Sequence, residues 1–195
     1  HGAVAAFIGA EMRQDKYADI YDPLSEAGQI GGSAGNSAAG NRDLDSLFFE
    51  VLFPLMDNLE MNIAGRYDDY SDFGSTFNPR LALVWSATEN ATIKLLYGRA
   101  FRAPFFAETL VTANPIALGN PDLKPEIVNT YETALNYVVS SRLIVDINAF
   151  RYDISDFITF IPDPGLSTAT AQNVGERTGY GVEAEIAYLI APSLH

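Results

Sequence analysis

Three glutamates are the residues of this sequence best suited to acid–base chemistry: Glu108, Glu126 and Glu132. Two carboxylates placed on either side of a sugar linkage are the arrangement that hydrolyses glycosides. No motif fixes the separation of any two of these carboxylates, so a catalytic pair is not expected. The two histidines, His1 and His195, stand at the ends of the chain, and there is no cysteine. We therefore expect neither an enzyme nor a cofactor.

Asp68, Asp69 and Asp72 offer oxygen atoms of the kind that Ca²⁺ binds. Their spacing does not match a calcium-binding loop motif. The sequence therefore favours a solvated acidic loop over a metal site, and no metal ligand is predicted elsewhere.

A further set of charged residues alternates with apolar neighbours, so its members would point to one face of a sheet. They could contact another protein segment or line a path for a substrate. They could equally be solvated, or pair with one another. The set comprises Arg66, Arg80, Lys94, Glu132, Asp146, Glu183 and Glu185.

The elements that would position these residues are β-strands, because apolar residues recur with a period of two rather than 3.6. The clearest segment is 59–68, where Leu59, Met61 and Ile63 oppose Glu60 and Asn62. About eight such strands are predicted along the chain. The phase changes after residue 148, which indicates a β-bulge near residue 149 or a change of surroundings there.

The connections between these strands are of two kinds. Short turns are predicted near Asp57, Glu89 and Ser141. Long loops are predicted at about 14–45, 69–78, 100–128 and 158–175, and the first is rich in Gly, Ser, Ala, Asn and Asp. Short turns at one end and long loops at the other are typical of outer-membrane β-barrels.

Composition agrees with this all-β class. The chain has 195 residues and a net charge of -13, which argues against binding to nucleic acid. Hydrophobic residues make up 48% of it, but no apolar run reaches the roughly 18 residues of a transmembrane helix. We expect residues 1–195 to be one part of a single outer-membrane barrel domain within a longer protein.

Two proline-containing motifs mark the middle of the chain: YGRAFRAP at 97–104 and NPDLKPE at 120–126. With DYSDFG at 69–74, NPR at 78–80 and GYGVE at 179–183, they resemble the barrel domain of TonB-dependent outer-membrane receptors. Prolines lack a backbone donor, so the stretch between the first two motifs reads as a rigid, extended crossing. The resemblance gives its residues a structural role: Arg99, Phe101, Arg102, Pro104, Asn120, Pro121, Leu123, Pro125 and Glu126.

The resemblance implies an up-and-down, antiparallel transmembrane barrel of 22 strands, of the plugged class. It also implies import of an iron-siderophore, a cobalamin or an oligosaccharide across the outer membrane of a Gram-negative bacterium. The expected partners are outer-membrane lipid, the receptor's own N-terminal plug, the TonB complex and the small nutrient, with no nucleic acid. Eight strands alone would leave two open edges, so we expect no stable monomer in water.

Two alternatives are compatible with the same pattern. A complete eight-stranded outer-membrane barrel would have an adhesive or structural role. A soluble β-sandwich or β-barrel could bind sugar, but it would need a polar outward face where Leu81, Leu83 and Trp85 stand.

Overall fold

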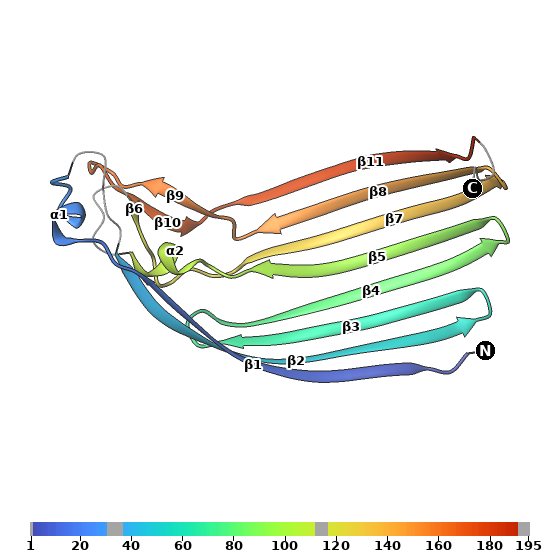
Figure 1. Ribbon diagram of the computed structural model, residues 1–195, viewed down its shortest axis with the longest axis horizontal. Coiled ribbons are helices and arrows are strands. Elements are labelled where there is room, and N and C mark those ends of the chain that lie inside the picture. The colour runs from blue at the N-terminus through green and yellow to red at the C-terminus, as the bar shows by residue number, and fades with distance from the viewer. Residues whose placement is uncertain (1, 31–36, 112–116, 191–195) are drawn as a thin grey trace.

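A curved sheet of eight antiparallel strands forms the body of the molecule (Figure 1). The computed structural model describes residues 2–30, 37–111 and 117–190. The sheet contains β1 (Ala5–Asp19), β2 (Ala38–Met56), β3 (Leu59–Tyr70), β4 (Gly74–Thr88), β5 (Ala91–Arg102), β7 (Glu126–Ser140), β8 (Leu143–Ser155) and β11 (Glu176–Tyr188). The prediction of about eight main strands is therefore confirmed.

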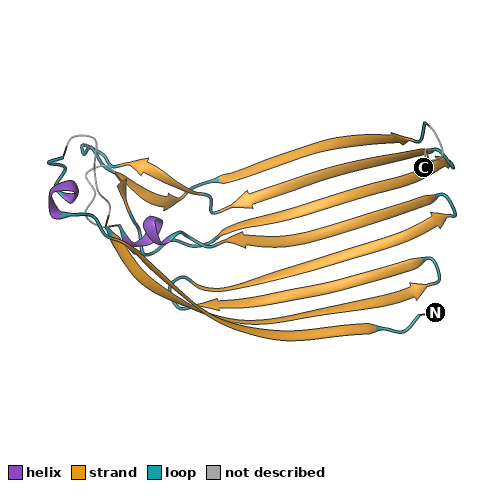
Figure 2. Cartoon of the chain, in the orientation of Figure 1, coloured by secondary structure: helices purple, strands orange, loops and turns teal. Residues whose placement is uncertain are grey.

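Smaller elements gather at one end of this sheet, which we call the loop end (Figure 2). They are the helices α1 (Pro23–Glu26) and α2 (Phe106–Leu110), and the strands β6 (Ala117–Leu118), β9 (Ile158–Pro162) and β10 (Ala169–Asn173). The three strands form a second sheet in the order β6-β10-β9. Among the described residues, no helix is long and apolar enough to cross a membrane.

The strands of the main sheet are joined in the order β1-β2-β3-β4-β5-β7-β8-β11. Within the described residues β1 and β11 do not pair with each other, so this sheet is open and both strands are edges. A complete eight-stranded barrel would require that pairing. The structure therefore contradicts the closed small barrel that was considered as an alternative.

Tight turns lie at the opposite end, which we call the turn end. They fall at residues 57–58, 89–90 and 141–142, as predicted. The ladder shifts register beside each of them, at Pro54/Met56, Ser86/Thr88 and Val138/Ser140. The predicted bulge near Ala149 is wrong, because β8 pairs without interruption there on both sides. The aromatic residues that follow in β8 simply lie on the inner face.

The register assigns every strand residue to one of two faces. One row across the sheet joins Glu50, Ala64, Arg80, Gly98 and Thr130 in neighbouring strands, and we call its side the inner face. The seven charged residues singled out in the sequence all fall on this face: Arg66, Arg80, Lys94, Glu132, Asp146, Glu183 and Glu185. That this face lines a lumen stays a prediction, because the sheet is open.

The outer face is apolar and exposed. Leu81, Trp85, Leu95 and Tyr137 each leave more than 40% of their surface uncovered. A continuous apolar surface of this kind marks contact with lipid or protein rather than with water. The soluble sugar-binding alternative required a polar outward face, so this surface contradicts it.

Two of the predicted long loops are shorter than expected. In place of a loop over 14–45, β1 and β2 continue as a paired ribbon to Asp19↔Ala38. The prediction missed this ribbon because its residues are small and polar and form no apolar face. Residues 31–36, at the centre of that prediction, lie outside the described residues. In place of a loop over 69–78, β3 and β4 join through a tight turn that Gly74 permits with φ of 87°.

The other two loops are folded rather than extended. The segment predicted at 100–128 begins with β5, which continues to Arg102, and then forms α2 and β6 before β7 starts at Glu126. The extended crossing is therefore wrong over α2. Residues 112–116 lie outside the described part of the chain. The segment predicted at 158–175 forms a β9–β10 hairpin, because Gly165 takes a φ of 76° at its turn.

Gly119 fixes how closely the segment after α2 packs against that helix. Its N–H donates to the carbonyl of Val111 at 2.7 Å. A Cβ there would stand 2.8–2.9 Å from backbone atoms of Thr109, Leu110 and Val111. We expect Gly119→Ala to destabilise the loop by about 1–3 kcal/mol, because a backbone contact cannot yield as a side chain can. This destabilisation should appear as faster amide exchange in α2 of the variant than in α2 of the wild type.

The matched control for that substitution is Gly98→Ala, since a Cβ at Gly98 would meet only the Arg80 side chain at 4.0 Å. Unchanged amide exchange in α2 of Gly119→Ala would contradict the expected clash.

Candidate functional site

Arg102 joins two carboxylates at the point where β5 ends. Its Nε and Nη2 donate to Glu126 at 2.8 and 2.9 Å, and its Nη1 and Nη2 donate to Glu108 at 3.0 and 3.2 Å. The guanidinium also lies 4.9 Å from the ring centroid of Phe105. The fork geometry of arginine suits two such bidentate contacts. Arg102 thereby ties β5, α2 and β7 together.

The two carboxylates extend this network to the backbone. Glu126 accepts the N–H of Ile158 at 2.7 Å, which anchors the start of β9. Glu108 accepts the N–H of Phe105 at 2.8 Å and so closes the first turn of α2. Hydrogen bonds from Arg102 are the main cause that lowers the pKa of Glu126, and the Ile158 N–H adds to it. Both glutamates are therefore structural acceptors here.

We expect this network to loosen in acid. Because the folded pKa of Glu126 is lowered, the carboxylate stabilises the fold above its unfolded pKa, near 4.5, and that contribution disappears as the pH falls through the lower folded value. Amide exchange at Ile158 and along β9, corrected for its intrinsic pH dependence, should accelerate in that window. Glu126→Gln should remove the transition, and an identical pH profile in this variant would contradict the assignment.

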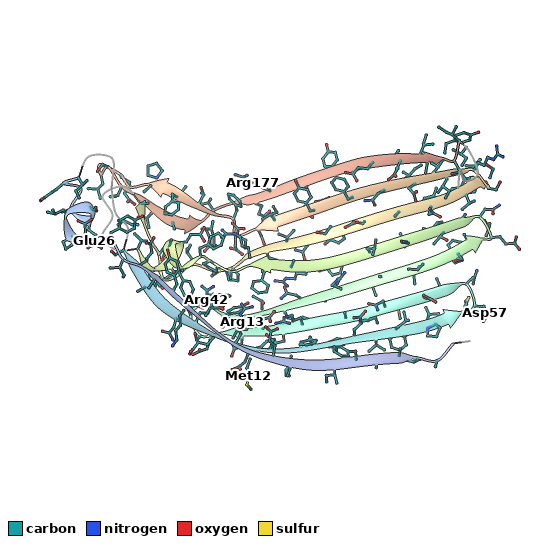
Figure 3. All side chains as sticks on the ribbon, in the orientation of Figure 1. Met12, Arg13, Glu26, Arg42, Asp57 and Arg177 are labelled. Atoms are coloured by element: carbon teal, nitrogen blue, oxygen red, sulfur yellow. The ribbon has the colours of Figure 1, made fainter. Side chains whose placement is uncertain are left out.

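Arg42 is a second arginine at the loop end, and its side chain is only 8% exposed. It lies where β2 passes beside α2 (Figure 3). Its Nε donates to Asp72 at 2.8 Å and its Nη2 donates to the carbonyl of Pro104 at 2.9 Å. These two contacts bring the turn between β3 and β4 and the segment after β5 onto β2.

Aromatic rings surround the Arg42 guanidinium. It stands 4.7, 5.0 and 5.8 Å from the ring centroids of Phe106, Phe73 and Tyr70. Tyr17 of β1 stacks on Phe106 at 5.4 Å, and Phe101 contacts both Tyr70 and Phe73. Stacking of cations on ring faces is stronger where water is excluded. The loop end is thus a packed cluster of arginines, carboxylates and rings.

The residues of the two proline motifs meet in this cluster and beside it. Pro104 is fully buried, and Leu123 packs with Ile158 and Ala171 in a small core. The N–H of Asn120 donates to the carbonyl of Glu108 at 2.8 Å. The remaining motif residues also lie here: Arg99 and Phe101 near the end of β5, Pro121 in the turn after Asn120, and Pro125 directly before β7.

Among the residues first considered for chemistry, several are neutralised by arginine. Asp68 is buried and bonded to Arg66 at 2.6 Å, and Asp72 is paired with Arg42. A solvated acidic loop is therefore wrong for Asp68, which lies within β3. The described residues contain no group of three or more His, Asp or Glu side chains that could hold a metal ion. Glu132 lies in the body of β7, away from Glu108 at the loop end.

The sequence reading missed Arg42, Phe106 and Tyr17. Arg42 stood within the segment predicted as a long loop at 14–45. The pattern gave no signal for Arg42, because Arg42 and Leu44 stand at even positions, whereas the apolar face of the strand that follows occupies odd positions from Leu47 onward. Nor does any pattern connect Arg42 with Asp72, 30 residues later.

Comparison with known proteins gives this architecture a family. The family model described as TonB dependent receptor-like, beta-barrel matches residues 3–191. The chain belongs to this family of TonB-dependent receptors. The family resemblance seen in the sequence is thereby confirmed. Relatives of the chain are named as outer-membrane proteins, and the chain is placed in the outer membrane of a Gram-negative bacterium.

Three relatives illustrate the family. The chain is 31% identical over 163 residues to the iron-regulated outer membrane virulence protein of Vibrio cholerae, covering 75% of this chain and 25% of that protein. It is 31% identical over 119 residues to the vitamin B12 transporter BtuB of Vibrio cholerae, covering 60% and 18%. It is 28% identical over 186 residues to the ferric enterobactin receptor of Pseudomonas aeruginosa, covering 82% and 23%. The chain thus spans about a quarter of their length or less.

Solved structures of the TonB-dependent receptor family have the same fold. A crystal structure of a mutant ferric enterobactin receptor from Pseudomonas aeruginosa superposes with a TM-score of 0.79 at 22% identity, covering 96% of this chain and 31% of that one. The siderophore receptor PirA of Acinetobacter baumannii gives a TM-score of 0.76 at 16% identity, covering 96% and 32%. The open sheet is therefore a portion of a barrel wall.

Proposed function

We propose that this chain forms part of the barrel wall of a receptor that takes up a scarce nutrient across the outer membrane by TonB-dependent transport. The family match over residues 3–191 is the observation that carries this proposal. The architecture supports it: an apolar outer face suits lipid, a charged inner face suits a hydrated interior, and loops carried at one end of a regular sheet suit ligand capture. The cargo would cross unchanged, without an enzymatic step.

A ferric siderophore is the cargo that we propose first. The relative with the highest coverage named above is a ferric enterobactin receptor, and another is named as iron-regulated. A cobalamin is the second candidate, because a vitamin B12 transporter matches 60% of the chain. An oligosaccharide has no counterpart among these names. The remaining partners in this proposal are the receptor's own plug and the TonB complex, outside these 195 residues.

Uptake by the intact receptor tests the proposal. Cells that express the full-length receptor should accumulate radiolabelled ferric siderophore several-fold faster than cells without it. Deletion of tonB should abolish the difference. Cyanocobalamin, labelled in the same strains, serves as the comparison cargo. Accumulation of labelled cargo that persists without TonB would overturn active transport, whereas uptake of cyanocobalamin alone would favour the second candidate.

A further inference from the structure

A hollow on the inner face lies across β5, β7, β8 and β11, which run side by side (Figure 1). Its volume is about 290 Å³. Three carboxylates line it, Asp146, Glu183 and Glu185, against one cation, Lys94. All four residues stand a few positions from the turns, so the hollow lies near the turn end. It therefore gathers negative charge at the end of the sheet opposite the arginines of the loop end.

The register of the sheet places these side chains together. Two neighbouring rows cross the strands here: the first joins Lys94, Ala134, Asn148 and Glu183, and the second joins Asn136, Asp146 and Glu185. The ladders are uninterrupted over both rows, so all of these side chains lie on the inner face. Ala134 stands between Lys94 and Asn148, and its small side chain leaves the space above it open.

The carboxylates of the hollow are not neutralised within the sheet. In the described part of the chain, none of the three has a lysine or arginine nitrogen within 4.0 Å, and Lys94 has no carboxylate oxygen within that distance. Asp146 and Glu185 stand directly opposite each other, and like charges in that position destabilise a sheet. Asn136 donates to Asp146 at 2.7 Å but supplies no charge. The wall thus holds a repulsion that an external cation would relieve.

Asn148 adds an unsatisfied acceptor to the lining of the hollow. Its Oδ1 is buried and receives no hydrogen bond from the described residues. A buried acceptor without a donor is costly, and Asn148 stands opposite Glu183, whose carboxylate is also an acceptor. Among the described residues no three His, Asp or Glu side chains converge on a metal site. A positively charged hydrogen-bond donor therefore fits the hollow better than a metal ion does.

We propose that this hollow receives a guanidinium or ammonium group of the receptor's own plug. Both groups are hydrogen-bond donors without an acceptor, and a guanidinium can bridge two carboxylates. The inference rests on the proposed function, because the plug is a partner only in that proposal.

The position of the hollow favours the plug over two other sources of a cation. A side chain that approaches from the interior meets both rows of the hollow. A side chain on a strand paired with the free edge of β11 would instead start two strand spacings from β8, or about 10 Å. A diffusible ligand would meet the loop end first, and the hollow lies toward the turn end.

Hydrogen–deuterium exchange of the purified full-length receptor in detergent tests this docking, at low ionic strength so that the charges are not screened. Asp146→Asn and Glu185→Gln each remove one negative charge and change the shape of the side chain little. We expect each to accelerate amide exchange in one segment of the plug about tenfold, as for the loss of a charge-assisted hydrogen bond. Glu60→Gln is the matched control, because Glu60 lies on the inner face of β3 near the turn end, opposite Pro54 and Val84.

The segment in which exchange changes identifies the source of the cation. Faster exchange in the plug of Asp146→Asn and Glu185→Gln, but not of Glu60→Gln, supports the proposal. Faster exchange only in a strand paired with β11 would assign the cation to the barrel wall and overturn it. Exchange that matches Glu60→Gln throughout would also overturn it, and a Tm above that of the wild type would then show that repulsion in an empty hollow had been relieved. Because neither measurement involves transport, its outcome is independent of the uptake experiment.

Discussion

Replacing Arg102 by alanine is expected to loosen the loop end by about 2–3 kcal/mol. Removing one partner of a fully buried ion pair costs about 3–5 kcal/mol, and the Arg102 side chain is 32% exposed, so the effect should be smaller. The substitution leaves Glu108 and Glu126, both mostly buried, without the cation that they share. Amide exchange in α2 and β9 should accelerate about 30–150-fold, since 1.4 kcal/mol corresponds to a factor of ten.

Arg151→Ala is the matched control for this prediction. Arg151 also pairs with a carboxylate, Asp153 at 2.9 Å, but its side chain is 60% exposed. Exposed pairs of this kind contribute at most about 1 kcal/mol. If amide exchange at the loop end is equally slow in Arg102→Ala and Arg151→Ala, Arg102 does not hold these segments together.

Arg42→Ala is expected to have an effect of about 3–5 kcal/mol, because the Arg42 side chain is nearly fully buried. It would leave Asp72 without its cation, the Pro104 carbonyl without its donor, and three rings around a cavity. Chymotrypsin cleaves after aromatic residues. Its cleavage after Phe73 and Phe106, identified by mass spectrometry, should therefore become much faster in the variant.

Arg42→Lys sharpens this prediction. Lysine keeps the positive charge, but it is a point charge that cannot reproduce the planar fork or its stacking on rings. We expect cleavage rates between those of the wild type and Arg42→Ala. If the Arg42→Lys variant and the wild type resist chymotrypsin equally, then charge alone, rather than the geometry of the guanidinium, holds the cluster together.

The sequence predicted the strands best where one face meets an apolar environment. Between Leu59 and Asp68 the outward residues are uniformly apolar, so the period of two is unmistakable and the structure has β3 there. Toward the loop end the outward side loses its apolar residues. The part of the β1–β2 ladder that ends at Asp19↔Ala38 therefore has no hydrophobic periodicity, although its backbone pairing is as regular as elsewhere.

The misplaced bulge has a comparable cause. Phe150 and Tyr152 are aromatic residues on the inner face, where polar residues were expected. They lie over Gly181 and Gly179 of β11, which have no side chains to fill that space. A ring that covers a glycine on the next strand imitates a change of phase when β8 is read alone. Only the neighbouring strand explains it.

The candidate site was partly predictable for a different reason. Arg102 and Glu126 belong to motifs that resemble the family, so they were singled out at once. Their shared contact with Glu108, and the contact of Arg42 with Asp72, depend on how loops of different origin meet. Periodicity describes one strand at a time, so it contains no information about such contacts.

The connections of the main sheet also set an order for its assembly. The strands from β2 to β5 form a meander joined by tight turns, whose closure costs little chain entropy. The β5–β7 and β8–β11 pairings each close across a long folded segment and cost more. The β2–β5 meander should therefore form early and serve as the template on which β7 and β8 dock. Arg102 and Glu126 are the pair of the β5–β7 ladder closest in sequence, so their contact closes the shortest loop and should start that pairing, which then extends toward the turn end.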